Sequence, residues 1–279
     1  MNNLIRMIAA AAALAVASVA LSPKANAGAV LDKVIAKNTL TVATGVDWGT
    51  LSFLNEKKEL DGFDVDVVKG IAQRLGVQVQ FVTPGWDLIA AGKWQGRWDV
   101  ALGGMTPTKA RAEKFDFPAI YLYFRRIALV HKDSKATKLS DLDGKVVGVA
   151  VNTTEEYYAN HTLTPDWVNA QPIHFEFTPG QVKTYESNRI AYDDLRLGDG
   201  VRLDAVIMGE QELPELIKAG YPFKQLGAPL FSSPGAVVIE RGDKEFGEKI
   251  AAAIQSMRDD GTLSQLSVKW YGVDYTTEN

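Results

Sequence analysis

The sequence predicts an α/β fold made of two successive units. Short apolar segments typical of strands alternate along the chain with segments whose apolar residues recur at helical spacing. Glycines follow several of the predicted helices, in the position where a left-handed backbone ends a helix. Strands and helices in this order favour a mostly parallel sheet flanked by helices.

The first unit has the pattern βαβαβ. Strands are expected at residues 39–43, 77–82 and 100–102, and residues 77–82 alternate with the period of a half-buried strand. Helices are expected at residues 65–75, where Gly76 supplies the C-terminal cap, and at 86–91. The second unit begins after the aromatic and basic segment 121–126. Its expected strands and helices are, in chain order, 127–131, 146–149, 205–208, 212–219 (helix), 236–239 and 245–259 (helix, ended by Gly261).

Residues 1–27 are typical of a cleaved signal peptide. Arg6 precedes an apolar run at residues 8–21, and Ala25-Asn26-Ala27 supplies the small residues of a cleavage site. The alternative, a membrane-anchoring helix, is less favoured because the run is short for a bilayer and rich in alanine. No cysteine follows to carry a lipid anchor, so we expect a free, exported protein.

Composition excludes several classes of function. Removing residues 1–27 leaves 252 residues, enough for two domains of about 125 residues each. Without Arg6 and Lys24 the formal net charge is −6, which makes nucleic acid and anionic membranes poor partners. The absence of cysteine excludes a disulfide scaffold, so stability must come from hydrophobic cores.

The sequence carries no recognisable catalytic or metal-binding motif. His131, His161 and His174 have no spacing that places two of them on one helical face, and there is neither a His-Glu-x-x-His run nor a Gly-x-Ser-x-Gly elbow. Gly103-Gly104 is not followed by the Lys-Ser/Thr of a phosphate loop. We therefore expect no metal, no cofactor and no enzymatic activity.

Residues 103–111 (GGMTPTKAR) directly follow a predicted strand and allow two interpretations. In the first, two glycines let a ligand approach the backbone, Thr106 adds a hydroxyl, and Arg111 clamps a carboxylate near a helix start. In the second, Thr106 is an ordinary N-cap, Pro107 the first helical residue and Arg111 solvated. Trp48, between Asp47 and Gly49, is likewise either a core aromatic or a stacking face in a loop.

Four segments in order resemble the family 3 extracellular solute-binding proteins, the periplasmic receptors for polar amino acids in ABC transport. They are Gly62-Phe63-Asp64-Val65-Asp66-Val67, then Gly103-Gly104-Met105-Thr106 with Arg111 and the following Phe115-Asp116-Phe117-Pro118, then residues 141–149, and finally Met257-Arg258-Asp259-Asp260-Gly261-Thr262. Each segment alone is weakly specific. Their order and spacing extend the resemblance through nearly the whole mature chain.

The resemblance implies a type II periplasmic binding protein fold, in which each of two α/β lobes has a mostly parallel sheet and two hinge crossings join them. The first lobe would be residues 28–122 plus 232–279, the second 127–226, and the crossings 123–126 and 227–231. A solute trapped between the lobes would close the hinge, so ligand should compact the protein.

The resemblance also implies a set of ligand-binding residues. Arg111 corresponds to the arginine that holds the ligand carboxylate, assisted by Gly104 and Thr106, while Trp48 stacks on the ligand and Trp86 forms a pocket wall. Thr153 and Thr154 follow the strand at 146–149, where relatives add donors to the same carboxylate. One position departs from the pattern. Gly209 stands where relatives place an aspartate for the ligand's ammonium group, which leaves either Glu210 in that role or a ligand without an ammonium group.

The resemblance therefore indicates a monomeric periplasmic protein that captures an amino acid or related carboxylate for an inner-membrane ABC permease. A runner-up is an exported enzyme of the cyclohexadienyl dehydratase type, whose relatives share the Gly-Gly-x-Thr/Ser stretch. In that case a buried Glu210 opposite Arg111 would act as general acid. A third candidate is a sensor domain or an interaction protein that has lost its ligand.

Overall fold

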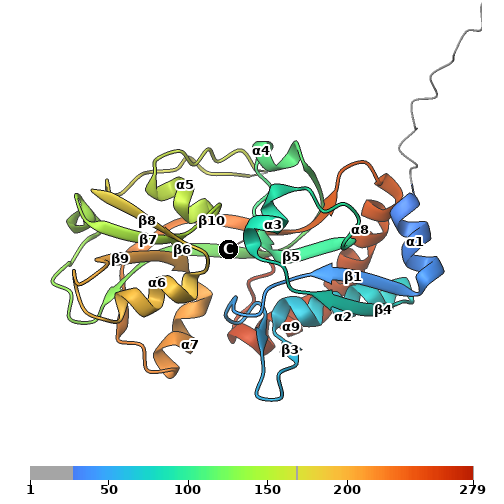
Figure 1. Cartoon of the computed structure of the whole chain (residues 1–279), viewed down its shortest axis with the longest axis horizontal. Coiled ribbons are helices and arrows are strands. Elements are labelled where there is room, and N and C mark those ends of the chain that lie inside the picture. Colours follow the sequence, from blue (N-terminus) through green and yellow to red (C-terminus); the bar gives the residue numbers. More distant parts are fainter. Residues whose placement is uncertain (1–27, 168, 279) are drawn as a thin grey trace, which may run out of the picture.

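The computed structural model describes residues 28–167 and 169–278. The signal peptide expected at residues 1–27 lies outside the described residues. Two lobes lie side by side and share one sheet that runs along the whole molecule (Figure 1). In the described part of the chain this sheet has eight strands in the order β4-β1-β5-β10-β6-β9-β7-β8.

Three parallel strands form the sheet of each lobe. The first lobe contains β4, β1 and β5, and the second contains β9, β7 and β8, all paired in parallel. Two long antiparallel strands, β6 and β10, lie between these groups and extend into both lobes (Figure 1). The strands are β1 Thr39–Ala43, β4 Gln78–Val82, β5 Val100–Met105, β6 Phe115–His131, β7 Val146–Ala150, β8 Gln181–Tyr185, β9 Ala205–Gly209 and β10 Phe223–Glu240, and a small hairpin pairs β2 Phe53–Leu54 with β3 Leu60–Asp61.

The helices cover the sheet separately in each lobe (Figure 1). Those of the first lobe are α1 Ala29–Lys37, α2 Phe63–Leu75, α3 Trp86–Ala91, α4 Lys109–Ala112, α8 Lys244–Asp259 and α9 Thr262–Tyr271. Those of the second lobe are α5 Thr154–Ala159, α6 Asn188–Leu195 and α7 Leu213–Lys218, with the short 3-10 helices η1 Leu139–Leu142 and η2 Glu210–Glu212.

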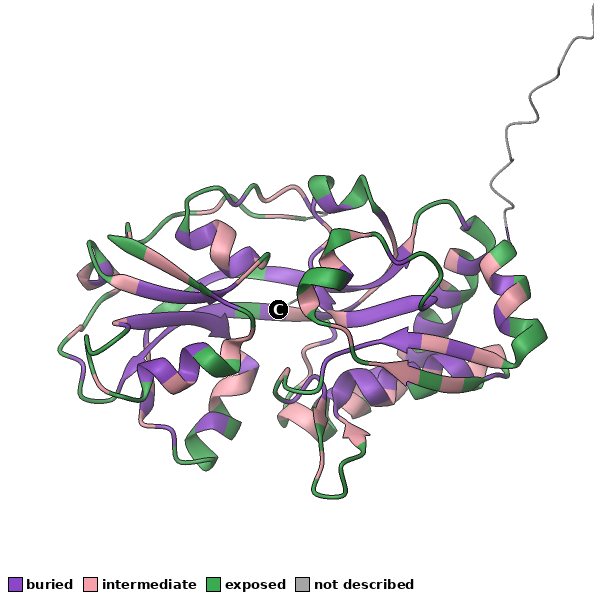
Figure 2. Ribbon diagram, viewed as in Figure 1, coloured by how far each residue is buried: buried purple, intermediate pink, exposed green. Residues whose placement is uncertain are grey.

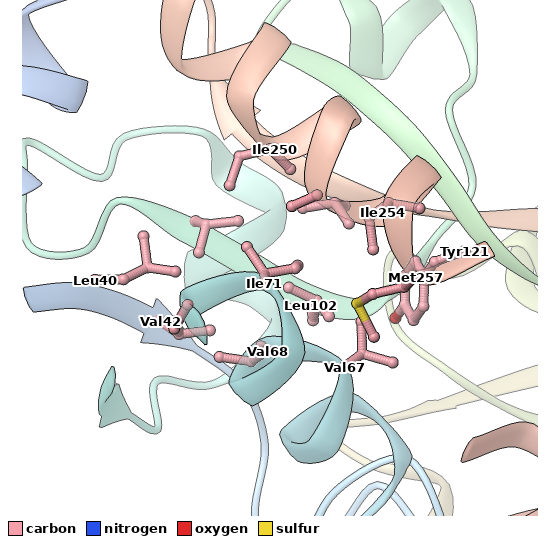
Figure 3. Packing of buried hydrophobic residues seen from close by; sticks show 14 of the residues in the cluster. Leu40, Val42, Val67, Val68, Ile71, Leu102, Tyr121, Ile250, Ile254 and Met257 are labelled. Carbon is pink, nitrogen blue, oxygen red and sulfur yellow. The ribbon is translucent and has the colours of Figure 1, made fainter. Parts of the chain in front are cut away.

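Each lobe has its own hydrophobic core, as the separate purple regions of Figure 2 indicate. In the first lobe, Ile71 of α2 packs in one cluster with Leu40 of β1 and Ile254 of α8 (Figure 3). Ile71 is completely buried, so truncating it to alanine should cost about 2–5 kcal/mol. The second lobe packs β7, β9 and α5 in another cluster, which includes Val147, Ile207 and Tyr158. The expected α/β fold of two lobes is confirmed.

Two long strands were predicted only as short fragments. The predicted strands at 127–131 and 236–239 are end segments of β6 and β10, which contain 17 and 18 residues. The preceding parts of these strands, residues 115–126 and 223–235, were missed because Pro118, Pro234 and the exposed Arg125 interrupt the apolar pattern there. The pairing of β6 with β10 is irregular between Leu226 and Phe231, which marks a break in the ladder between the lobes.

The expected helix start at Thr106 and Pro107 is wrong by two residues. Helix α4 begins at Lys109, and its N-cap is Thr108, whose hydroxyl accepts a hydrogen bond from the Arg111 backbone N–H at 3.3 Å. Strand β5 continues to Met105, beyond its predicted end, so the chain leaves the sheet later than expected. The solvated Arg111 of the second interpretation is also wrong, because the residue is buried.

Candidate functional site

A cleft between the two lobes opens where six parallel strands end. The ends of β1, β4, β5, β7, β8 and β9, or the segments that follow them, line it, together with Phe124 and Arg126 of β6. The carboxyl ends of parallel strands are the usual ligand side of an α/β sheet. The cleft holds about 740 Å³ of space outside the atoms, part of it open to solvent.

Arg111 lies at the centre of the polar side of this cleft, and its side chain is almost completely buried. Its Nη1 donates to the Thr106 carbonyl oxygen at 3.0 Å, which fixes the guanidinium against the end of β5. Burial lowers the pKa of Arg111, while Tyr157 and Glu155 nearby raise it. A guanidinium keeps its charge despite such a shift, so Arg111 is a fixed cation in a partly desolvated cleft.

Asn152 of the second lobe contacts two side chains of the first lobe. Its backbone carbonyl oxygen accepts hydrogen bonds from Arg111 Nη2 at 2.8 Å and from Trp86 Nε1 at 3.4 Å. Asn152 has a left-handed backbone with φ 60°, a conformation that asparagine tolerates better than most residues. The tight turn after β7 therefore directs a carbonyl group across the cleft.

Three aromatic side chains form the apolar side of the cleft. Trp48 and Trp86 meet edge to face with centroids 5.7 Å apart, and Phe124 lies beside them in the lining. Trp48 is half-buried, so it is neither a core aromatic nor a fully exposed one. A Cβ added at Gly103 would lie 2.5 Å from the Trp48 ring, so glycine is required for this close approach.

Gly104 and Thr106 both line the cleft, but their polar groups are partly used within the protein. The Gly104 N–H donates to the Tyr121 hydroxyl at 3.0 Å and thus points toward the core. The Thr106 carbonyl oxygen accepts from Arg111, as described above. Thr106 is almost completely buried, so little of its surface is exposed to the cleft.

Thr153 and Thr154 lie on the opposite wall at the start of α5. The Thr153 hydroxyl accepts from the Glu156 N–H at 3.3 Å and donates to the Ala150 carbonyl oxygen at 2.7 Å. The Thr154 hydroxyl donates to Glu155 Oε2 at 2.9 Å. Both hydroxyls therefore stabilise the wall in this state of the cleft.

Glu210 is the one expected site residue that the structure places outside the cleft lining. Its carboxylate pairs with the Arg125 guanidinium at 2.7 Å, on the outer side of β6. Glu212, two residues later, lines the cleft instead. The 3-10 helix η2 carries residues 210–212, so consecutive side chains there project in different directions.

Glu212 is a carboxyl group in a desolvated position. Burial raises its pKa to about 7, although a hydrogen bond from the Tyr192 hydroxyl and the charge of Arg126 act in the opposite direction. The distance between Tyr192 Oη and Glu212 Oε2 is 2.9 Å. A Cβ added at Gly49 of the first lobe would lie 3.3 Å from the same oxygen, so Glu212 faces the first lobe across the cleft.

Arg126 and Glu155 form a buried ion pair that sequence reasoning missed. Arg126 Nη1 lies 2.7 Å from Glu155 Oε1, and both side chains line the cleft. The guanidinium also lies over the Phe124 ring, 4.3 Å from its centroid. The basic segment 121–126 contained the only available signal, but nothing in it distinguished the inward Arg126 from the outward Arg125.

The charges around the cleft are unequal once this pair is set aside. Arg111 is the remaining cation, whereas Asp47, Glu186 and Glu212 are acidic groups in the lining.

Among residues 28–167 and 169–278, no group of three His, Cys, Asp or Glu side chains is arranged to hold a metal ion. No helix in the same residues is long and apolar enough to cross a membrane.

These features define a two-lobed solute-binding protein. Residues 40–273 match the bacterial extracellular solute-binding proteins, family 3, and the chain belongs to this family. It is 30% identical over 249 residues to the L-cystine-binding protein TcyJ of Escherichia coli K12, covering 88% of this chain and 87% of that relative. It is 26% identical to the arginine-binding extracellular protein ArtP of Bacillus subtilis, covering 84% and 87%.

Solved structures share the fold. An ancestral arginine-binding protein bound to arginine superposes with a TM-score of 0.72 at 29% identity, covering 84% of this chain and 99% of that one. The ancestral amino acid-binding protein AncCDT-1, a precursor of cyclohexadienyl dehydratase, superposes with a TM-score of 0.74 at 28% identity, covering 86% and 99%. The family assignment expected from the sequence motifs is confirmed.

Proposed function

We propose that this protein is exported to the periplasm, captures an amino acid or a closely related carboxylate between its lobes, and delivers it to an ABC permease. The observation that carries the proposal is the buried Arg111 guanidinium in an aromatic cleft between the lobes. A planar fork of N–H donors matches a carboxylate in two parallel hydrogen bonds. The relatives named for cystine and arginine support an amino acid as the solute.

The proposed binding residues are those expected from the sequence, except that Glu212 replaces Glu210. Arg111 holds the carboxylate, Trp48 and Trp86 enclose the apolar part of the solute, and Glu212 faces a cationic group. Gly104, Thr106, Thr153 and Thr154 shape the walls around the carboxylate. The lobes are proposed as residues 28–122 plus 232–279 and 127–226, with the crossings at 123–126 and 227–231. The β6–β10 ladder is irregular between Leu226 and Phe231, within the second crossing.

Calorimetric titration of the mature protein with the common amino acids, cystine and small organic acids tests this proposal. We expect at least one amino acid to bind with micromolar or tighter affinity, and the Arg111→Ala variant to lose that binding. Failure of every compound, or an unchanged affinity in the variant, would reject the proposal. The intact mass of the secreted protein tests export separately, since cleavage after Ala27 leaves Gly28 as the first residue. Light scattering tests the proposed monomer.

A second candidate function is a dehydratase that acts on a cyclic carboxylate. The observation that favours it is Glu212, since a carboxyl group in the cleft with a pKa of about 7, near the Arg126 guanidinium, suits a general acid. Glu212 thus takes the role first considered for Glu210. Incubation with prephenate or arogenate, followed by absorbance, separates the candidates. Steady turnover that Glu212→Gln abolishes would establish the enzyme, whereas tight amino-acid binding without turnover excludes it.

A further inference from the structure

A chain of three buried groups connects the core of the first lobe to the cleft wall. The Tyr121 hydroxyl donates to Asp64 Oδ1 at 2.8 Å and accepts from the Gly104 N–H at 3.0 Å. Asp64 and Tyr121 are both completely buried, and Gly104 lines the cleft. The Asp64 carboxyl group is therefore connected to the cleft wall at Gly104 through the Tyr121 hydroxyl.

The directions of these hydrogen bonds depend on one another. A tyrosine hydroxyl can donate only one hydrogen bond, and the Tyr121 hydroxyl donates it to Asp64 Oδ1. The hydroxyl lone pairs are thereby directed toward Gly104, whose N–H is the donor of the second bond. Without the acceptor on Asp64, the hydroxyl could rotate and the bond to Gly104 would lose its fixed geometry.

Stability alone does not explain the carboxyl group at position 64. Its second oxygen, Oδ2, is buried without a hydrogen-bond partner in the described part of the chain, and burial raises its pKa to about 8. Burying a carboxyl group in this way is unfavourable, and an apolar side chain of similar size would not carry this cost. The group is therefore costly for the fold, which favours a role in holding the cleft wall.

Close packing and this bond both restrict the orientation of Gly104. Its backbone is left-handed with φ +64°, and a Cβ at this position would lie 2.2 Å from the Phe124 ring. On the other side, a Cβ at Gly235 would lie 2.9 Å from the Gly104 Cα atom. The peptide group between Gly103 and Gly104 is thus confined, and Tyr121 determines the direction of its N–H.

We propose that Asp64 and Tyr121 are positioning residues that orient the Gly103–Gly104 peptide, and with it the wall from which Arg111 and Thr106 meet the solute. The effect on binding rests on the proposed function, whereas the effect on the peptide does not. Tyr121→Phe removes the hydroxyl and retains the ring, which stacks on Phe63 at 5.9 Å. Tyr271→Phe is the matched control, since its buried hydroxyl has no partner among the described residues.

Site-resolved hydrogen exchange on the mature protein measures the effect without any ligand. In Tyr121→Phe we expect the Gly104 amide to exchange at least about tenfold faster, while the Val42 amide in β1 reports any global loss of stability. Asp64→Leu should have the same effect, and Asp64→Asn should retain slow exchange because its Oδ1 still accepts. Unchanged Gly104 exchange in Tyr121→Phe, or equal acceleration of Gly104 and Val42, would overturn the proposal.

Calorimetry with L-cystine and L-arginine then measures the consequence for binding. We expect the dissociation constant of whichever compound binds to rise about fivefold or more in Tyr121→Phe and to stay unchanged in Tyr271→Phe. Faster Gly104 exchange with unchanged affinity would overturn the positioning role. If neither compound binds the wild-type protein, the amino acid or organic acid that binds in the broader titration takes their place. If no compound binds, the proposed function fails, and the exchange result alone decides how the peptide is held.

Discussion

Arg111 of the first lobe donates through Nη2 to the carbonyl oxygen of Asn152 in the second lobe at 2.8 Å. One guanidinium thus contacts both walls of the cleft, because Nη1 donates to Thr106 at the same time. A solute carboxylate that binds Arg111 would be held by the group that also joins the lobes. We therefore expect ligand binding and lobe closure to be coupled through this residue.

Arg111→Lys separates the contribution of the two parallel guanidinium hydrogen bonds from that of the positive charge. Lysine retains the cation but cannot make two parallel hydrogen bonds, so we expect affinity to fall about tenfold to a hundredfold. Arg111→Ala should lose more, about 3 kcal/mol or greater. Calorimetric titration with the best-binding amino acid measures both variants. Equal affinity of the Arg111→Lys variant and the wild-type protein would show that only the charge matters.

Glu212 predicts a pH dependence of binding. With a pKa of about 7, the group is mostly protonated at pH 6 and mostly ionised at pH 8. A solute with an ammonium group prefers the ionised form, so its affinity should rise about tenfold between pH 6 and pH 8. The groups that influence Glu212 are Tyr192, Arg126 and Glu155, and Arg126 stays charged in this range.

Glu212→Gln is the control for this pH dependence. The variant should bind an ammonium-bearing solute more weakly at pH 8 and with a nearly flat profile from pH 6 to pH 8. Affinity that instead falls as pH rises would indicate that the protonated Glu212 donates to the solute. That result would favour a ligand without an ammonium group.

Asp64 predicts a stability change of known sign. Its pKa is about 8 in the folded protein against 3.8 for the ordinary group, so the folded state retains a proton that the unfolded state releases. The free energy of unfolding should therefore fall as pH rises from about 4 to about 8 because of this group. Asp64→Asn removes this loss and should stabilise the protein by about 2–5 kcal/mol at pH 8.

Urea denaturation at pH 5 and pH 8 measures this difference. The stabilisation of Asp64→Asn should be clearly larger at pH 8 than at pH 5. A matched variant, Asp260→Asn, removes an exposed carboxyl group whose pKa is lowered, so it should not become more stabilising as pH rises. An Asp64→Asn variant that is less stable than wild type at pH 8 contradicts a pKa of Asp64 raised far above 3.8.

Local patterns predicted the two α/β units, whereas for Arg111 they left two interpretations open and only the family resemblance indicated a carboxylate clamp. Helix α3 and strand β1 have the predicted bounds, since apolar periodicity and nearby glycines determine them. The resemblance to a known family supplied the lobes and the aromatic walls. Seven of the eight expected site residues line the cleft.

The remaining features depend on contacts between distant segments. The pairing of Arg126 with Glu155 joins residues on β6 and α5, and neither residue has a distinctive neighbour in sequence. Whether Glu210 or Glu212 lines the cleft depends on the orientation of the short helix η2, and the two residues are identical in type. Such choices are made by tertiary packing and not by local propensity.

The Arg126–Glu155 pair predicts strongly non-additive mutations. Arg126→Met leaves Glu155 buried without its partner and should destabilise the protein by about 3–5 kcal/mol. Glu155→Met should have a similar cost, whereas the double variant replaces the pair by apolar groups and should recover most of the loss. Thermal and urea unfolding of the four proteins measure this coupling. Additive effects of the two substitutions would contradict a buried pair.

Gly104→Ala should destroy the cleft wall, and the reason is steric as well as conformational. The new Cβ would lie 2.2 Å from the Phe124 ring, in a backbone with φ +64° that disfavours alanine. Gly96→Ala is the matched control, because Gly96 has φ +70° and no atom lies within 4 Å of the added Cβ. We expect Gly96→Ala to cost about 1 kcal/mol and leave binding unchanged. Gly104→Ala should cost more in urea unfolding and abolish binding in calorimetry, since Phe124 or the β5 end must move. Equal effects of the two substitutions would mean that left-handed strain alone, and not the contact with Phe124, makes glycine necessary in the cleft.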